Sequence, residues 1–398
     1  MDVRLETRAV HGGEDRRGAH DALTTPIVMS STFTFADTRE ILAFVERKAA
    51  GETPRRYEYG RYGNPTQTAA ERKLAELDGG ERALLFSSGM AAITTTLLAL
   101  LSSRDHLVMI GGAYRRTREF VSTCLPRWGI EADFVDGGLD KVKAAIRPTT
   151  RAVFFEVPTN PHLRVADVEA IAALGRSRGV TTIVDATFAT PINLRPIEVG
   201  IDLVIHSATK YLGGHNDLLA GAAIGSSERL EAIEALRGVT GAVAAPLDAY
   251  LVLRGVKTLP IRVRQQNESA ARLAEFLDAH PAIDRVHYPG LPGHPDHAVA
   301  ARLMSGFGGV VSFELAGGLD AASACIDRLA IPYIGPTLGG VESIAQQQAL
   351  FVSPDPAERA RSGIPDGLIR YAVGLEAVDD LIEDLAQALD GLPTGEVV

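Results

Sequence analysis

The sequence has few cysteines, no long uninterrupted apolar run and no basic tract. Only Cys124 and Cys325 occur among 398 residues, which indicates a reducing compartment rather than a disulfide-stabilised secreted protein. The most apolar stretch, 83–101, is interrupted by serines and threonines, so it does not predict a membrane span. The N-terminus lacks the apolar core of a secretory signal. We therefore expect a cytoplasmic protein with no membrane partner.

Charge and composition exclude further classes. The chain carries 40 Lys and Arg against 50 Asp and Glu, a net charge of −10, so a surface that binds the nucleic-acid backbone is not expected. Hydrophobic residues make up 46% and charged residues 23%. This balance is typical of a globular enzyme and excludes a disordered or fibrous chain.

The pattern of apolar residues divides the chain into three parts. Residues 1–55 show little periodicity, which predicts an arm that lies across its own body or across a partner subunit. Residues 56–250 alternate short apolar runs with helical spacing, as in 139–146 and 168–178, which predicts a parallel sheet covered on both faces. Residues 251–398 begin with a long helical stretch and predict a smaller α/β domain. The expected strands of the large domain are ALLFSS, HLVMIGG, AVFFEVP, TTIVDAT and DLVIHSA.

Polar residues follow three of these runs at equal intervals. Asn160, Asp185 and Lys210 lie 25 residues apart, the length of one strand-helix-strand step. In an open α/β sheet, ligands bind beyond the carboxyl ends of the strands. The sequence therefore predicts an amide, a carboxylate and an amine at one edge of one sheet.

A fourth run, LLFSSGMAA, leads from a strand through Ser87, Ser88 and Gly89 into a helix. Free amides and the helix dipole make such a junction a seat for phosphate, and Ser207 and Thr209 are candidate hydroxyl donors beside it. A phosphate seat, a lysine, a carboxylate and an amide together suggest pyridoxal phosphate.

In this interpretation Lys210 holds the aldehyde as a Schiff base, Asp185 pairs with the pyridine nitrogen, and Asn160 bonds the ring hydroxyl. Each residue alone has an ordinary explanation as a loop charge, a helix cap or a turn. Their order on successive strand ends favours the site.

SATKYLGGHND (207–217) closely resembles the cofactor-lysine motif of the Cys/Met-metabolism family of pyridoxal-phosphate enzymes. That family includes cystathionine gamma-synthase, cystathionine gamma-lyase, methionine gamma-lyase and the O-acylhomoserine sulfhydrylases. The resemblance covers nearly the whole chain, in the family's order. The other matching segments are YEYGRYGNPT (57–66), FSSGMAA (86–92), EVPTNP (156–161), VDATFATP (184–191), LRGVKTLPIR (253–262), TLGGVES (337–343) and LIRYAVGLE (368–376).

The resemblance implies a fold and an assembly. The fold would be the type I fold of pyridoxal-phosphate-dependent transferases, which is aspartate-aminotransferase-like. It has a large, mostly parallel α/β domain (56–250) and a smaller C-terminal α/β domain (251–398). The family is usually a homotetramer built as a dimer of dimers. Residues 1–55 would then cross to a partner subunit, and Tyr59 and Arg61 would reach the phosphate of that neighbour.

The resemblance also implies residue roles. Lys210 would be the Schiff-base lysine and proton carrier, and Tyr114 would stack on the ring and protonate the leaving group. The cofactor would be held by Gly89, Met90, Asn160, Asp185, Ser207 and Thr209, besides Lys210, Tyr59 and Arg61. An amino-acid substrate would be bound by Arg370 through its α-carboxylate, and its pocket would include Arg116, Thr337, Leu338 and Glu342. No metal is expected, because His287, His294 and His297 lie in a Pro/Gly-rich stretch without nearby acidic ligands.

The chain departs from the family pattern at four places. Arg115 and Arg116 replace small residues after Tyr114, Thr337 replaces a serine, Ala186 replaces an asparagine, and AQQQALFVS (345–353) replaces a stretch rich in His, Pro, Ser and Thr. The change at 186 is read as drift. At position 116 a guanidinium would favour an anionic or strongly polar distal group on the substrate, or would pair with an acid in the wall.

These observations lead to an expected reaction, the γ-elimination of a γ-substituted L-amino acid by a methionine or cystathionine gamma-lyase type of C–S lyase. One alternative is γ-replacement, as in cystathionine gamma-synthase or an O-acylhomoserine sulfhydrylase. Another is γ-elimination of an unusual leaving group in a specialised biosynthetic pathway. A non-catalytic relative is disfavoured, because a binding module needs none of this chemistry.

Overall fold

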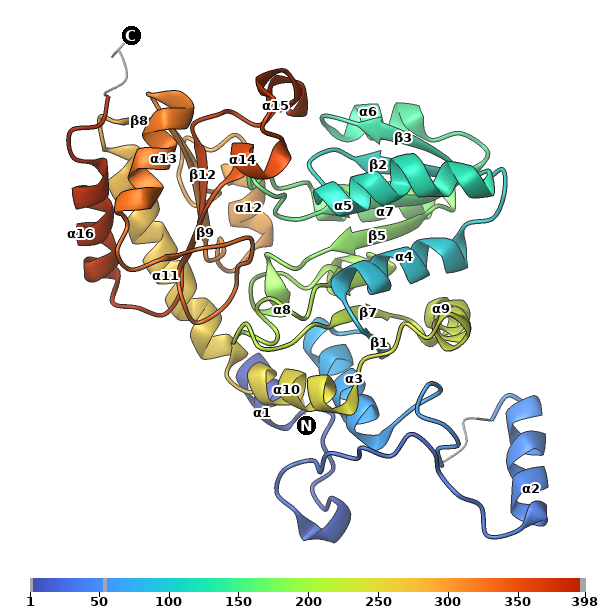
Figure 1. The fold of residues 1–398 in the computed structure, drawn as a ribbon. Helices are drawn as coiled ribbons and strands as arrows, with labels where there is room; N and C mark the ends of the chain where they lie inside the picture. Colours follow the sequence, from blue (N-terminus) through green and yellow to red (C-terminus); the bar gives the residue numbers. More distant parts are fainter. Residues whose placement is uncertain (1–2, 53–55, 394–398) are drawn as a thin grey trace.

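The structure, a computed structural model, describes residues 3–52 and 56–393. Two β-sheets, each with its own helices, form the body of the molecule (Figure 1). The large sheet has the strand order β1-β7-β6-β5-β4-β2-β3. Its strands are β1 (Arg82–Phe86), β2 (His106–Ile110), β3 (Glu131–Val135), β4 (Thr150–Glu156), β5 (Thr181–Asp185), β6 (Leu203–His206) and β7 (Gly221–Gly225).

The large sheet is mostly parallel, which confirms the predicted fold class. Only β7 runs against its neighbours β1 and β6, while the pairs from β3 to β6 are all parallel. The five apolar runs singled out in the sequence form β1, β2, β4, β5 and β6. The antiparallel strand β7 (GAAIG) was not anticipated, because glycine and alanine give no strand signal.

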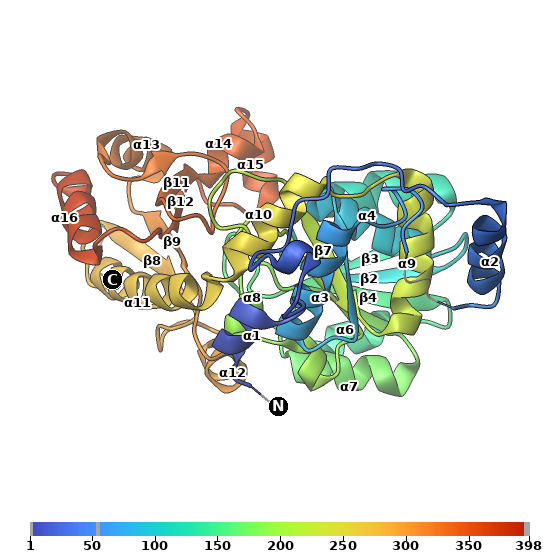
Figure 2. The same ribbon diagram turned by 90° about the horizontal axis from the view of Figure 1, so that it is seen from below.

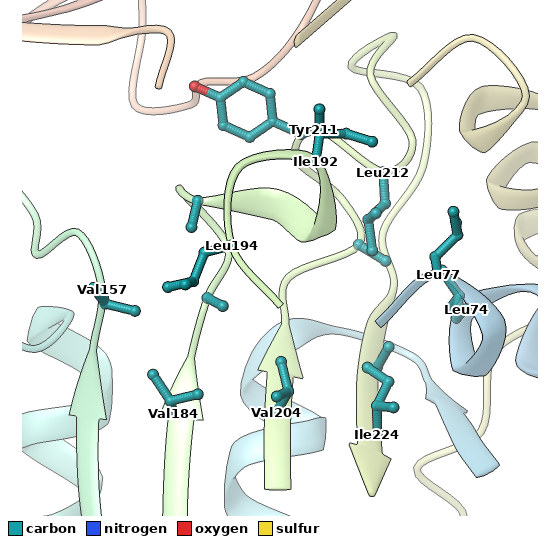
Figure 3. Packing of buried hydrophobic residues seen from close by; sticks show 14 of the residues in the cluster. Leu74, Leu77, Val157, Val184, Ile192, Leu194, Val204, Tyr211, Leu212 and Ile224 are labelled. Atoms are coloured by element: carbon teal, nitrogen blue, oxygen red, sulfur yellow. The ribbon is translucent and has the colours of Figure 1, made fainter. Parts of the chain in front are cut away.

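Helices cover both faces of this sheet (Figure 2). One face buries side chains against helices α3, α6, α7 and α10, and the other against α4 and α9. Figure 3 shows the first face, where Val184, Val204 and Ile224 form a row across adjacent strands and Leu74 and Leu77 of α3 lie at the Ile224 end of this row. These helices are α3 (Pro65–Asp78), α4 (Gly89–Leu100), α6 (Leu139–Ala145), α7 (Val168–Arg178), α9 (Ser227–Thr240) and α10 (Pro246–Val256).

The small sheet has the order β10-β11-β12-β9-β8 and is antiparallel except for the pair β10-β11. Helices α11, α13 and α16 pack on it around a core of their own. Its strands are β8 (Ile283–His287), β9 (Val310–Leu315), β10 (Tyr333–Ile334), β11 (Ile344–Gln347) and β12 (Leu368–Ala372). The helices of this part are α11 (Leu259–Asp278), α12 (His297–Leu303), α13 (Gly318–Arg328), α14 (Gln348–Val352), α15 (Pro356–Ser362) and α16 (Val378–Leu389).

The long helical stretch expected from residue 251 is broken into α10 and α11, which corrects that prediction. Pro260 lies in the first turn of α11, where its missing N–H is tolerated but where it prevents continuation from the preceding helix. Along α11, Leu259 and Val263 belong to the core of the large sheet, and side chains from Ala270 onward belong to that of the small sheet. The predicted division near residue 250 stays a prediction.

The N-terminal segment is only partly attached to the body. Helix α1 (Leu5–His11) buries Ala9, whose carbonyl accepts a hydrogen bond from the buried Lys73 Nζ at 3.0 Å. Helix α2 (Thr38–Ala49) lies at the far end of the large domain (Figure 1). Several large apolar side chains of this segment are exposed in the single chain: Leu23, Met29, Ile41, Leu42 and Val45. Within the described residues, we find no helix that combines the length and the apolar character needed to cross a membrane.

Candidate active site

The polar residues predicted at the strand ends line one cavity of about 220 Å³ between the two sheets. Helix α4 follows β1, Tyr114 follows β2, Asp185 ends β5 and Lys210 follows β6, so these groups meet because parallel strands end at the same edge. Arg370 comes from β12 of the small sheet. The predicted site residues found in the lining are Gly89, Met90, Tyr114, Asn160, Asp185, Ser207, Thr209, Lys210, Leu338 and Arg370.

The start of α4 has the features of a phosphate seat. Ser88 caps the helix by accepting a hydrogen bond from Ala91 N at 3.0 Å, and the amides of the first turn have no partner within the helix. A Cβ at Gly89 would come within 2.8 Å of Ser207 Cβ, so glycine allows the helix start to approach the β6 loop. The Thr209 hydroxyl, in contrast, is already bonded to the main chain of Ala220.

Asp185 is held at the end of β5 by a local turn. Its Oδ1 accepts hydrogen bonds from the Thr187 amide at 2.9 Å and from the Thr187 hydroxyl at 2.6 Å. The same hydroxyl oxygen accepts from Ser207 N at 2.8 Å. Thr187 therefore ties the ends of β5 and β6 together and leaves Asp185 Oδ2 for a ligand.

A second buried carboxyl, Glu156, lies opposite Asp185 in the register of β4 and β5. It accepts a hydrogen bond from the backbone amide of Tyr114. Burial and the charge of Asp185 raise the pKa of Glu156 well above its usual value. Burial also raises the pKa of Asp185, but there the bonds from Thr187 and the charge of His206 oppose it. Of the two carboxyls, Glu156 is the one that keeps its proton.

Lys210 lies four residues beyond β6 and is mostly buried. Its Nζ donates to the Thr337 hydroxyl at 2.7 Å, and no carboxylate pairs with it among the described residues. Burial and, to a lesser extent, the nearby Arg370 cation lower its pKa from 10.5 to about 8. A lysine with such a pKa is a nucleophilic amine near neutral pH.

Arg370 is a buried cation at the opposite wall. Its guanidinium donates to Asn160 Oδ1 at 3.2 Å, to the Thr337 carbonyl at 3.1 Å and to Gln346 Oε1. All three acceptors are neutral, and Nε has no partner in the described part of the chain. Buried polar groups are normally satisfied, so this guanidinium is suited to an incoming carboxylate.

Other predicted residues lie outside this cavity. Arg116 is half-exposed and pairs with Glu119 at 2.6 Å, and Glu342 accepts from Asn216 at 2.8 Å. Neither side chain is in the described lining, nor is that of Thr337, which contributes through its bonds to Lys210 and Arg370. The structure thus does not bring Arg116 to the pocket of its own chain.

Tyr59 and Arg61 are also absent from the described lining. The Arg61 guanidinium lies 5.4 Å from the Tyr59 ring centroid and donates to the Gly238 carbonyl at 3.0 Å. Both belong to the segment between the N-terminal arm and α3. Their predicted role concerns a neighbouring subunit and stays a prediction.

The sequence reasoning did not single out Glu156 and Thr187. A charged residue that ends an apolar run, and a threonine two residues after a sheet-end aspartate, were the available signals. Contrary to the prediction that the histidines lack acidic neighbours, His287 lies 2.6 Å from Glu314. No set of three or more metal-ligating side chains is found among the described residues.

Comparisons with known proteins agree with this geometry. The model of the family described as "Cys/Met metabolism PLP-dependent enzyme" matches residues 6–390. Cystathionine gamma-synthase 1 of Nicotiana tabacum is 45% identical over 96% of this chain and 71% of its own length. L-methionine gamma-lyase of Fusobacterium nucleatum subsp. polymorphum is 42% identical over 97% of this chain and 98% of its own.

The fold has solved counterparts as well. Cystathionine gamma-lyase from Lactobacillus plantarum, crystallised with L-serine, is 36% identical and superimposes with a TM-score of 0.89 over 98% of this chain and 99% of that one. The predicted family resemblance is confirmed. The cavity offers an amine, a carboxylate and a helix start that together fit pyridoxal 5′-phosphate (PLP). The chain therefore belongs to the family of PLP-dependent enzymes of Cys/Met metabolism.

Proposed function

We propose that the protein catalyses γ-elimination on a γ-substituted L-amino acid, as a C–S lyase of the methionine or cystathionine gamma-lyase type. One observation carries this proposal. Arg370, a buried guanidinium whose described partners are all neutral, shares a cavity with the Lys210 amine. A cation opposite a nucleophilic amine suits a substrate with an α-carboxylate and an α-amino group.

The residues that would hold the cofactor follow from the cavity. Lys210 would bind its aldehyde, Asp185 its ring nitrogen, and the start of α4 at Gly89 and Met90, with Ser207, its phosphate. Thr209 would join the phosphate site by turning its hydroxyl proton away from the Ala220 carbonyl. Asn160, whose Oδ1 is bonded to Arg370, still has its amide nitrogen for the ring hydroxyl. When bound, PLP withdraws electrons from the substrate and so makes protons at Cα and Cβ removable.

Three side chains then have separate roles in the reaction. Arg370 holds the α-carboxylate. Lys210 Nζ accepts the proton that leaves Cα, passes it on and, neutral again, accepts the proton that leaves Cβ. The bond from Cγ to the leaving group breaks with its electron pair on that group, which Tyr114 Oη protonates. Addition of one water releases a 2-oxo acid and ammonia, so the atoms balance.

Replacement at Cγ is the second candidate. It is favoured by the relatives, since the cystathionine gamma-synthase of Nicotiana tabacum, at 45%, is more identical to this chain than the methionine gamma-lyase at 42%. In that reaction a thiol adds at Cγ and the amino group is retained. Elimination of an unusual leaving group is the third candidate. It rests on the sequence change at Arg115 and Arg116 after Tyr114, although neither arginine is in the described lining of the cavity of its own chain.

We also propose a homotetramer, built as a dimer of dimers, in the cytoplasm. The exposed apolar side chains of residues 23–45 support association. The position of Tyr59 and Arg61 away from the cavity of their own chain supports a site shared between two subunits. The N-terminal segment would then be covered by the partner.

The test is a product analysis. The purified PLP-loaded protein is incubated with cystathionine, methionine, O-acylhomoserine with cysteine, and γ-halogenated amino acids, and products are identified by mass. We expect a 2-oxo acid and ammonia, and neither from Lys210→Ala. A thioether as the main product would establish replacement instead, and no turnover of any γ-substituted substrate would refute the proposal.

A further inference from the structure

Strands β11 and β12 place Gln346 directly opposite Arg370. Side chains at paired positions of neighbouring strands lie on the same face, and Gln346 Oε1 accepts a hydrogen bond from Arg370 Nη2. The next residue, Gln347, points to the other face, where it bonds Ser323 and Leu319 of the α13 region. Of these two adjacent glutamines, only Gln346 contacts Arg370.

The amide of Gln346 is fixed in one orientation. Its Oε1 accepts a second hydrogen bond, at 3.2 Å, from Gln348 Nε2. A guanidinium only donates, so the atom of Gln346 that faces Arg370 has to be an acceptor. Both glutamines fall within the 345–353 stretch that departs from the family pattern.

The three described hydrogen-bond acceptors of Arg370 are all neutral and come from three different places in the chain. Asn160 follows β4, the Thr337 carbonyl lies in the loop before β11, and Gln346 lies in β11 itself. No carboxylate forms an ion pair with Arg370 among the described residues. A glutamate at position 346 would have nearly the same shape but would neutralise the guanidinium and leave less of its charge for a ligand.

We propose that Gln346 is a positioning and specificity-determining residue: its neutral amide aims the Arg370 guanidinium while leaving the positive charge free for the α-carboxylate of the substrate. This inference rests on the proposed role of Arg370 as the carboxylate-binding residue. The site would then prefer amino acids over amines and amides because the residue at position 346 carries no charge. Gln348 supports it by holding the amide oxygen in place.

The experiment compares two ligands without a γ-leaving group, L-norleucine and its carboxamide. Their dissociation constants are measured from the change in visible absorbance of the PLP-loaded protein, for the parent, Gln346→Glu and Gln346→Met. We expect Gln346→Glu to weaken norleucine binding by about 10- to 100-fold, the effect of a lost charge-assisted contact. The affinity for the carboxamide should stay within about threefold, because its neutral group does not depend on that charge. Gln346→Met, which adds no charge, should keep most of the preference for norleucine.

Two outcomes overturn the inference. One is an unchanged ratio of the two dissociation constants in Gln346→Glu, and the other is an equal loss for both ligands, which indicates a merely structural role. A failure of the proposed reaction can be told apart from a failure of this inference. If the ratio collapses as expected while the parent turns over none of the γ-substituted substrates, position 346 has the assigned role and only the reaction is wrong.

Discussion

We expect the pKa of Lys210 to change when Arg370 is substituted. Burial and then Arg370 lower its pKa from 10.5 to about 8, which corresponds to about 3 kcal/mol against holding the ammonium there. With that value, about a quarter of the amine is neutral at pH 7.5, compared with about one part in a thousand for an ordinary lysine. Only the neutral amine is nucleophilic, so labelling should rise as the pH increases through about 8.

The assay is competitive labelling of the cofactor-free protein with an amine-acylating reagent between pH 6 and 10. The peptide that contains Lys210 is quantified by mass spectrometry, with the exposed Lys143 as the internal reference. Arg370→Met should move the midpoint of Lys210 labelling above about 8, because a neighbouring cation disfavours the ammonium. Arg370→Lys, which keeps the charge, should move it less.

A parent protein that labels at Lys210 with a midpoint near 10.5 would refute the reasoning, since burial would then impose no penalty on the charge. A downward shift in Arg370→Met would refute the electrostatic part alone. Circular dichroism of each variant excludes unfolding as the source of a change. The midpoint expected for Arg370→Met stays below 10.5, because burial is the larger of the two causes.

Three further predictions concern other parts of the molecule. Glu156→Gln should cost less than about 1 kcal/mol, since the raised pKa of the parent carboxyl favours its neutral form. The parent should lose stability as the pH rises from the ordinary pKa of a glutamate through the raised pKa of Glu156. Urea unfolding at several pH values should show a smaller loss in the variant, where only Asp185 of the two carboxyls remains. Arg237→Met should cost about 1–3 kcal/mol, because the partly buried Glu71 loses its ion pair with the buried Arg237 and, among the described residues, keeps only the hydrogen bond from the Leu85 amide. Chemical denaturation measures this cost, and the catalytic constants should be unchanged. Mixing inactive Arg61→Ala and Lys210→Ala subunits should restore about a quarter of the sites, whereas no recovery would place each site within one chain.

Most of the large domain could be predicted from local patterns. Runs such as AVFFEVP and TTIVDAT are apolar because both faces of a parallel strand are buried, and the residue after such a run lies at the ligand-binding edge by topology. Asp185 is the last residue of β5, and Lys210 lies four residues beyond β6. The equal spacing of Asn160, Asp185 and Lys210 in the sequence therefore corresponds to their common position in the lining of one cavity.

The features of the site that the sequence did not predict depend on contacts between residues that are far apart in the sequence. Arg370 and Gln346 are 24 positions apart and meet through the register of two strands, which no local pattern fixes. The pKa of Glu156 is raised in part by the charge of Asp185, which lies opposite it on the neighbouring strand. Arg116 lies two residues from Tyr114 in the sequence, yet its side chain pairs with Glu119 and is outside the described lining of the cavity of its own chain. Its role toward the substrate stays a prediction.

The arrangement of charges in the cavity explains why these long-range contacts matter for chemistry. Lys210 and Arg370 are both basic, but burial and, to a lesser extent, the Arg370 cation lower the pKa of Lys210 to about 8 and so raise its neutral fraction, whereas the arginine keeps its proton. At the other wall, Asp185 and Glu156 are both acids, and burial with mutual repulsion leaves the proton on Glu156. In each pair one member keeps its charge, and the neutral form of the other is favoured relative to an ordinary lysine or glutamate. The charged members, Arg370 and Asp185, are suited to a carboxylate and a pyridinium, and the neutral fraction of Lys210 supplies the nucleophile and base.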